Sequence, residues 1–98
     1  MTQSQIEDNI KKIIFRHLSP KKYKIFVYGS RATGKARKWS DYDIGVVEKE
    51  EVPYPILAKV SEELENSNIP VNVDVVDFHH VSDRFKKLAL YKIIPWTT

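Results

Sequence analysis

Three aspartates of the chain are spaced in a way that suits the binding of a divalent cation. Asp41 and Asp43 are separated by a single residue. In a β-strand this spacing turns both carboxylates to the same face, because side chains alternate along a strand. Neighbouring carboxylates repel each other, and a cation between them relieves the repulsion; their oxygen atoms suit Mg²⁺. An exposed strand end with two solvated aspartates would have the same sequence, so the pair alone leaves both interpretations open.

Asp74 supplies a third carboxylate, in the valine-rich run 73–77. Aspartate is disfavoured inside strands. With the flanking valines on the core face, Asp74 turns to the opposite face, where it joins Asp41 and Asp43 if the two strands are neighbours. The same alternation places Asp77 on the valine face or past the strand end, so we interpret Asp77 as a structural or capping residue. The alternative for Asp74 is an outward-facing polar residue on a half-exposed sheet.

A turn that could bind phosphate precedes the aspartate pair. All three glycines fall within residues 29–45, and Gly29-Ser30 directly follows a short apolar run. Such a turn frees backbone N–H groups at the start of a helix, where an anion can bind. Basic residues without an acidic neighbour follow at Arg31, Lys35, Arg37 and Lys38. An ordinary strand-to-helix turn with a serine cap is the alternative, since such turns are common.

The elements that must position these residues can be predicted from hydrophobic periodicity. We expect helices at about 4–18, 55–66 and 81–91, with one or two short helical turns within 30–37. Strands are expected at 24–28, 42–48 and 71–77. The order α-β-α-β-α-β-α predicts an α/β (α+β) fold, a small mixed sheet flanked by helices. The last helix should carry its apolar face on Phe85, Leu88 and Ala89, and the apolar segment 93–96 should cap the core or face a partner.

Length and composition bound the class of protein. With 98 residues, 42% of them hydrophobic, we expect one domain spanning residues 1–98. The chain has no cysteine and no apolar run near the ~20 residues of a membrane span, so a cytoplasmic protein without membrane association is the expectation. The net charge of +3 is too small to predict direct DNA binding.

Two segments of the chain resemble the core motif of the DNA polymerase β-like nucleotidyltransferases: Gly29-Ser30-Arg31-Ala32-Thr33-Gly34 and Ser40-Asp41-Tyr42-Asp43-Ile44-Gly45-Val46. In length and motif the chain looks like the minimal nucleotidyltransferases (MNT) of bacteria and archaea. The resemblance implies the polymerase β-like fold, with ATP as substrate and two Mg²⁺ ions as cofactor. It also implies that Asp41 and Asp43 bind both metals and that Asp74 completes the catalytic metal site. By the same resemblance, the nucleotide contacts are Gly29, Ser30, Arg31 and Ser40.

The resemblance also suggests what the chain acts on. Minimal members are often encoded beside a HEPN protein, a helical ribonuclease toxin, and serve as its antitoxin. In that pairing the MNT protein transfers AMP from ATP to a tyrosine of the toxin. The alternative is a non-catalytic, nucleotide-binding antitoxin that acts by complex formation, and a homo-oligomer is possible in either case. Transfer to a small molecule is a third possibility, although no acceptor-binding domain is visible in the sequence to support it.

Two other features have competing explanations. His79-His80 could bind a metal, but adjacent histidines project in different directions and suit Zn²⁺ better than Mg²⁺, so a surface turn is the preferred interpretation. Trp39 precedes the aspartate pair and could stack on a nucleotide base or pack over its own loop. Three further aromatic residues near the first strand are interpreted as structural: Tyr23, Phe26 and Tyr28.

Overall fold

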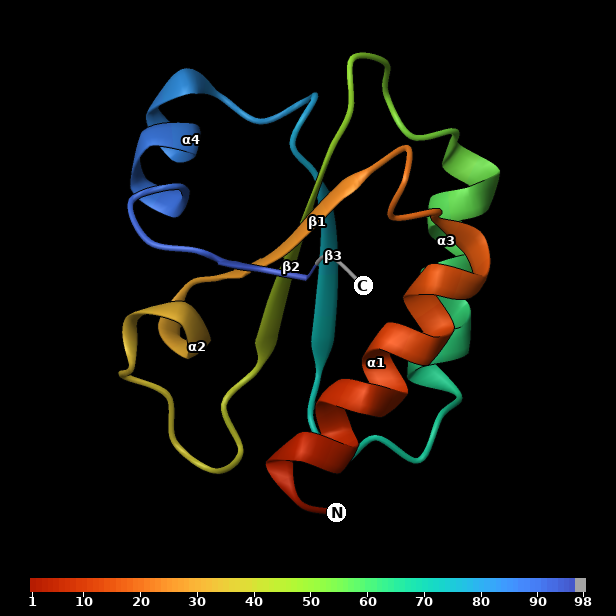
Figure 1. Ribbon diagram of the computed structural model, residues 1–98, viewed down its shortest axis with the longest axis vertical. Helices are drawn as coiled ribbons and strands as arrows, with labels where there is room; N and C mark the ends of the chain where they lie inside the picture. Colours follow the sequence, from red (N-terminus) through yellow and green to blue (C-terminus); the bar gives the residue numbers. More distant parts are fainter. Residues whose placement is uncertain (97–98) are drawn as a thin grey trace.

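The fold is a four-stranded mixed sheet with helices on both sides, as seen in a computed structural model that describes residues 1–96 (Figure 1). The helices are α1 (Gln3–His17), α2 (Ser30–Thr33), α3 (Tyr54–Glu65) and α4 (Asp83–Ala89). The strands are β1 (Lys24–Tyr28), β2 (Tyr42–Val47), β3 (Val73–Asp77) and β4 (Ile94–Pro95). Figure 1 shows α1 and α3 on one side of the sheet and α2 and α4 on the other. The expected fold class is confirmed, and the expected order of seven elements is found with one further strand, β4, after it.

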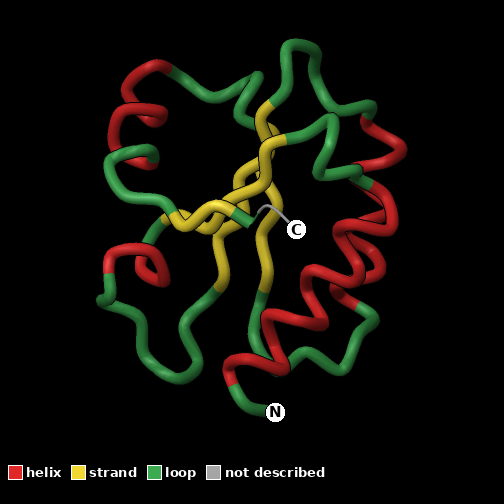
Figure 2. Tube along the Cα trace, in the orientation of Figure 1, coloured by secondary structure: helices red, strands yellow, loops and turns green. Residues whose placement is uncertain are grey.

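The strands form one sheet of order β3-β2-β1-β4. Figure 2 shows them gathered between the helices on either side. β2 pairs with β1 in an antiparallel ladder and with β3 in a parallel one. The sequence pattern missed β4, because two residues that include a proline show no alternation to detect. This strand pairs antiparallel with β1, and the N–H of Trp96 beyond it donates to the Ile25 carbonyl at 2.7 Å.

The main core lies between the sheet and the pair α1 and α3. α1 begins at a capping box, in which Thr2 and Gln5 satisfy each other's backbone N–H groups. Trp96 is buried over the end of this core, with its ring 6.4 Å from that of Tyr42. The tail therefore caps the core through Trp96, whereas Thr97 and Thr98 lie outside the described residues. The core is made by apolar residues of α1, α3 and the inward sheet face, among them Ile10, Ile14, Leu18, Ile25, Val27, Tyr42, Ile44, Val46, Val60 and Leu64.

A smaller aromatic cluster occupies the other face of the sheet. Phe26, Tyr28 and Phe78 are buried there, and Phe85 of α4 packs its ring 6.0 Å from that of Tyr28. Gly45 leaves room for this cluster, because a Cβ at that position would fall 2.3 Å from the Phe26 ring. These contacts confirm Phe26 and Tyr28 as structural residues.

The prediction of the apolar face of α4 is partly wrong. Leu88 is 72% exposed, and no residue of α4 is fully buried. The helix is also shorter than expected, because the Ser82 hydroxyl accepts the Phe85 N–H and fixes the start at Asp83. The helix packs on the aromatic cluster of the sheet through Phe85 and Ala89, as predicted for these two residues. Within residues 1–96, no helix has both the length and the apolar character needed to cross a membrane.

Candidate active site

Two of the three aspartates lie side by side on the sheet face that carries the aromatic cluster. In the parallel register, Asp43 of β2 is the direct partner of Asp74 of β3. On its other side Asp43 is paired with Tyr28 of β1. The expectation that the second and third strands are neighbours is therefore confirmed, and it brings Asp43 and Asp74 together from separate parts of the chain.

Asp41 lies one residue before β2 and is exposed, so it belongs to the loop and not to the strand. Its charge nevertheless reaches Asp43. Burial raises the pKa of the Asp43 carboxyl above its ordinary value, and the negative charges of Asp74 and Asp41 raise this pKa further. The charges of Asp74 and Asp41 therefore both act on the Asp43 carboxyl, which is harder to ionise than an ordinary aspartate.

Tyr28 presents a neutral hydroxyl to this group. Burial raises the pKa of Tyr28 to about 12, with further contributions from the charges of Asp43 and Asp74. The side chain is 8% exposed and packs against Phe78 and Phe85. The sequence pattern does not indicate that Tyr28 borders the carboxylates; only its place in the register opposite Asp43 reveals this.

Gly29 brings the main chain close to the Asp43 carboxylate. A Cβ added to Gly29 would lie 2.5 Å from Oδ2 of Asp43. Gly29 also has φ 74° and ψ −151°, a conformation that is essentially confined to glycine. Its carbonyl accepts the N–H groups of Ala32 and Thr33 and so starts α2, with Ser30 as the first helical residue. The Gly29-Ser30 turn is thus placed directly against the carboxylate group.

Arg31 and Ser40 have contacts within the loop that joins α2 to β2. The Arg31 guanidinium donates to the Ser40 carbonyl at 2.7 Å and to the Lys38 carbonyl at 3.2 Å. It also lies 4.3 Å from the centre of the Tyr42 ring. The Ser40 hydroxyl accepts the Arg37 N–H at 2.8 Å. Both residues therefore fix the loop that leads into Asp41, a role that sequence reasoning did not foresee.

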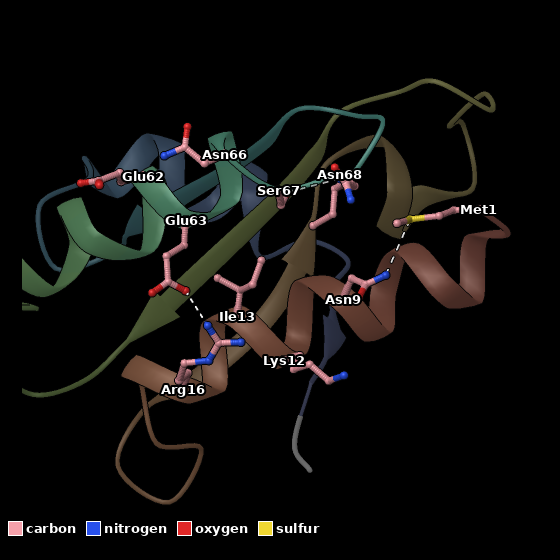
Figure 3. A pocket seen from close by; sticks show the side chains of 11 residues that line it. Met1, Asn9, Lys12, Ile13, Arg16, Glu62, Glu63, Asn66, Ser67 and Asn68 are labelled. Atoms are coloured by element: carbon pink, nitrogen blue, oxygen red, sulfur yellow. Dashed lines mark hydrogen bonds and ion pairs between the residues drawn. The ribbon is translucent and has the colours of Figure 1, made fainter.

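A groove of about 660 Å³ gives access to the carboxylates. On the sheet face that carries the carboxylates, the groove is lined by Tyr28, Asp43, Asp74 and Phe85. From there it continues across β3 to α3. A second hollow of about 420 Å³ lies between α1 and the end of α3, where Arg16 forms an ion pair with Glu63 at 3.0 Å (Figure 3). The pKa of Glu63 is lowered, chiefly by its hydrogen bond to His17 and further by the charge of Arg16. This hollow contains none of the aspartates discussed above.

The donor set of the site fits a hard divalent cation such as Mg²⁺. All three candidate ligands are carboxylates, and the raised pKa of Asp43 reflects buried negative charge that a cation would offset. The contact between Gly29 and Asp43 leaves no side chain between the turn and the carboxylate. Over residues 1–96, however, no set of three or more His, Asp or Glu side chains is already gathered closely enough to hold an ion.

The other acidic and aromatic candidates lie apart from this group. Asp77 accepts the N–H groups of Val52 at 2.8 Å and of His79 at 3.0 Å, which confirms it as a structural residue. His79 and His80 are exposed in the turn after β3, and His80 contacts Glu51. Trp39 is 61% exposed, so it does not pack over its loop as one interpretation required.

Comparison with known proteins agrees with this geometry. The family described as "Polymerase beta, Nucleotidyltransferase" matches residues 8–94. A Haemophilus influenzae protein named "Probable protein adenylyltransferase MntA" is 32% identical over 79 residues, covering 81% of this chain and 68% of the relative. A solved structure assigned to the minimal nucleotidyltransferases has a TM-score of 0.70 at 26% identity, covering 97% of this chain and 96% of that one.

The fold also recurs in a chain from the complex of a tri-AMPylated Shewanella oneidensis HEPN toxin with its MNT antitoxin. The TM-score is 0.70 at 21% identity, and the match covers 99% of this chain and 74% of that one. The family match, the identity to the Haemophilus protein and the carboxylates on β2 and β3 lead to one conclusion. The chain belongs to the polymerase beta nucleotidyltransferase family and is a nucleotidyltransferase.

Proposed function

We propose that this chain is a Mg²⁺-dependent adenylyltransferase that moves AMP from ATP to a tyrosine of a HEPN-family partner and thereby acts as its antitoxin. The observation that carries the proposal is the register pair of Asp43 and Asp74, with Gly29 against the Asp43 carboxylate. The name of the Haemophilus relative supports the reaction, and the AMP-modified HEPN toxin in the Shewanella complex supports the acceptor.

The reaction exchanges a phosphoanhydride bond of ATP for a phosphoester bond to the acceptor. The tyrosine oxygen forms a bond to the α-phosphorus of ATP, the bond between the α- and β-phosphates breaks, and pyrophosphate leaves. When bound, Mg²⁺ lowers the pKa of the attacking hydroxyl and offsets charge on the triphosphate. Asp74 is exposed at the open side of the site, where it can take up the proton that the hydroxyl releases.

The other site residues are proposed to bind the metal, to bind the triphosphate or to position the loop beside them. Asp41 and Asp43 are the proposed ligands of the metal, and Asp74 completes the site. The backbone of Gly29 and the Ser30 hydroxyl, at the start of α2, hold the triphosphate. Arg31 and Ser40 act on the nucleotide through the loop that they fix, because the Arg31 guanidinium is bound to loop carbonyls.

A non-catalytic antitoxin, which binds nucleotide and partner without transfer, is the second candidate. The observation that favours it is the place of Asp41, which lies exposed in the loop before β2 and not on the strand that carries Asp43. Such a protein would tolerate the loss of Asp74, whereas transfer would not.

Label transfer from ATP distinguishes the two candidates. The purified chain is incubated with ATP labelled at the α-phosphate, Mg²⁺ and lysate of the source cell, and a labelled protein is identified by mass spectrometry. We expect a labelled tyrosine in a HEPN-family protein, and about a hundredfold less label with Asp43→Asn. Asp77→Asn is the matched control, because Asp77 lies three residues from Asp74 but bonds only to the main chain. Binding of Mg²⁺-ATP and of the partner without any label would establish the second candidate.

A further inference from the structure

The two edges of the sheet differ in a way that bears on the acceptor. The β1 edge is covered by β4, which has two residues and contains Pro95, and strands this short or with proline resist further pairing. β3 is the last strand on the other side, and within residues 1–96 no strand pairs with its outer edge. β3 contains neither lysine nor proline, the residues that usually protect such an edge.

The direction of the main-chain groups in β3 follows from the bonds at its two ends. The N–H of Tyr42 donates to the Asn72 carbonyl, and the N–H of Phe78 donates to the Val46 carbonyl, both at 2.9 Å. Because alternate residues face the partner strand in a parallel ladder, Asp74 turns its main-chain groups toward β2. Val73 and Val75 therefore turn their N–H and carbonyl groups outward, away from the sheet.

Grooves lie on both sides of this open edge. On the site side, the groove between Asp43, Asp74 and Phe85 passes over β3 toward α3. On the helix side, a hollow of about 470 Å³ lies between Val75 and the exposed face of α3, which includes Leu57. An extended peptide along the edge would thus find a groove on each face for its side chains, which alternate between the two faces.

We propose that the open edge of β3 binds the acceptor protein as an added extended strand, whose acceptor side chain lies beside Asp74. The proposal rests on the function proposed above and adds how the acceptor is held. Main-chain bonds to Val73 and Val75 supply affinity with little dependence on sequence, as in other cases of strand addition. A side chain opposite or diagonal to Asp74 lies about 5–8 Å away between Cβ atoms, within reach of an aromatic ring.

The chemistry of the edge favours a polypeptide over the other occupants. β3 contains two aspartates and no lysine or arginine, so this strand offers no cation to the phosphates of a nucleic acid. Outward N–H and carbonyl groups at every second residue match the main chain of an extended peptide. A second copy of this chain could also pair with the edge, and the experiment below separates that case.

Proline at position 75 tests the edge directly. Val75→Pro removes one outward N–H, and no bond to β2 is lost because that N–H faces away from β2. We expect the KM for the labelled acceptor protein to rise about tenfold, the effect of losing one hydrogen bond of about 1.4 kcal/mol, with the KM for ATP unchanged. Val75→Ala trims the side chain but keeps the N–H, so its effect should be smaller. Equal effects of the two substitutions, or none with Val75→Pro, would overturn the proposal.

Hydrogen exchange in the unaltered protein provides a test that does not depend on the variant folding. On addition of the acceptor protein, the exchange rates of the Val73 and Val75 amides should fall by about tenfold or by a larger factor. The amides of Asp74 and Val76, which face β2, should exchange slowly with or without the acceptor. Unchanged exchange at Val73 and Val75 in the saturated complex contradicts the proposal. Slowing with rising concentration of the chain alone would assign the edge to a second copy. If the chain binds its partner but transfers no label, the proposed reaction fails, yet these amides still report whether the partner occupies the edge.

Discussion

The main chain of Gly29 lies against the carboxylate of Asp43, with space for a hydrogen atom but not for a methyl group. A Cβ at Gly29 would fall 2.5 Å from Oδ2 of Asp43. The turn at Gly29 starts α2, and Asp43 is the residue of β2 paired with Asp74. Any shift of Gly29 is therefore transmitted to the proposed triphosphate site and to the carboxylates together.

The first prediction compares the two glycines with positive φ. Gly29→Ala should lower the free energy of unfolding by about 1–3 kcal/mol, because its φ and ψ are unfavourable for a side chain. It should also displace Asp43 and reduce transfer. Gly34→Ala is the matched control: Gly34 has φ 79°, but no atom lies within 4 Å of its added Cβ. Thermal unfolding should therefore show that both variants are destabilised. Label transfer per folded molecule should fall in Gly29→Ala and be retained in Gly34→Ala. Equal activities would contradict a role for the contact with Asp43.

The second prediction separates two aspartates of the same strand. Asp77→Ala leaves the buried Val52 N–H without its acceptor, so the free energy of unfolding should fall by about 1–3 kcal/mol. Transfer by the folded fraction should be retained. Asp74→Asn should have the opposite profile, with lost transfer and, in metal-free protein, no loss of stability, because it removes a charge that disfavours ionised Asp43. Denaturant unfolding in EDTA and label transfer with Mg²⁺ measure both. Active Asp74→Asn would exclude Asp74 from the reaction.

Much of the fold and the site can be predicted from the sequence, because both depend on local patterns. The period-two runs around Asp43 and Asp74 indicate strands, and the alternation turns Asp74 away from the face of Val73 and Val75; the register then pairs Asp74 with Asp43. The assignment of Asp77 as structural follows from the same alternation, and its bonds to Val52 and His79 agree.

Other features depend on contacts between distant segments, which the sequence pattern does not contain. Leu88 has the spacing of a core residue, but α4 packs against the sheet through Phe85 and Ala89 and leaves Leu88 exposed. β4 becomes a strand only because β1 offers it an edge. Arg31 is part of a basic stretch in the sequence, and only the folded loop shows that its guanidinium binds main-chain carbonyls.

The third prediction concerns this loop. Arg31→Lys keeps the charge but loses the planar fork that reaches two carbonyls and stacks on Tyr42. We expect the loop to open more often, so trypsin should cleave after Lys35 and Lys38 faster than in the unaltered protein. Label transfer by Arg31→Lys should also fall, because the same loop positions Asp41. Arg16→Lys is the control, since Arg16 is an exposed residue that pairs with Glu63 on the opposite side of the sheet. Cleavage at the same rate in both variants would mean that Arg31 does not hold the loop closed.

The fourth prediction follows from the raised pKa of Asp43. Because the folded-state pKa lies above the unfolded value of about 3.8, protonated Asp43 favours the folded state. This contribution to stability is fully present below the unfolded pKa and is lost as the pH rises through the folded pKa. The difference in unfolding free energy between the unaltered protein and Asp43→Asn should therefore decrease as the pH rises from below 3.8 through the folded pKa in EDTA. Subtracting the variant removes the titration of the other carboxylates that the two proteins share.

Saturating Mg²⁺ should reverse this trend, since a bound cation favours the ionised carboxylate and binds only the folded protein. Thermal unfolding across the same pH series, with EDTA or with Mg²⁺, measures both effects. A difference that does not change with pH in EDTA would show that burial and the charges of Asp74 and Asp41 do not act on Asp43. A pH dependence in EDTA that Mg²⁺ leaves unaltered would instead mean that the carboxylates, although close together, do not bind the ion. The two results therefore test the electrostatics of the site and its occupancy separately.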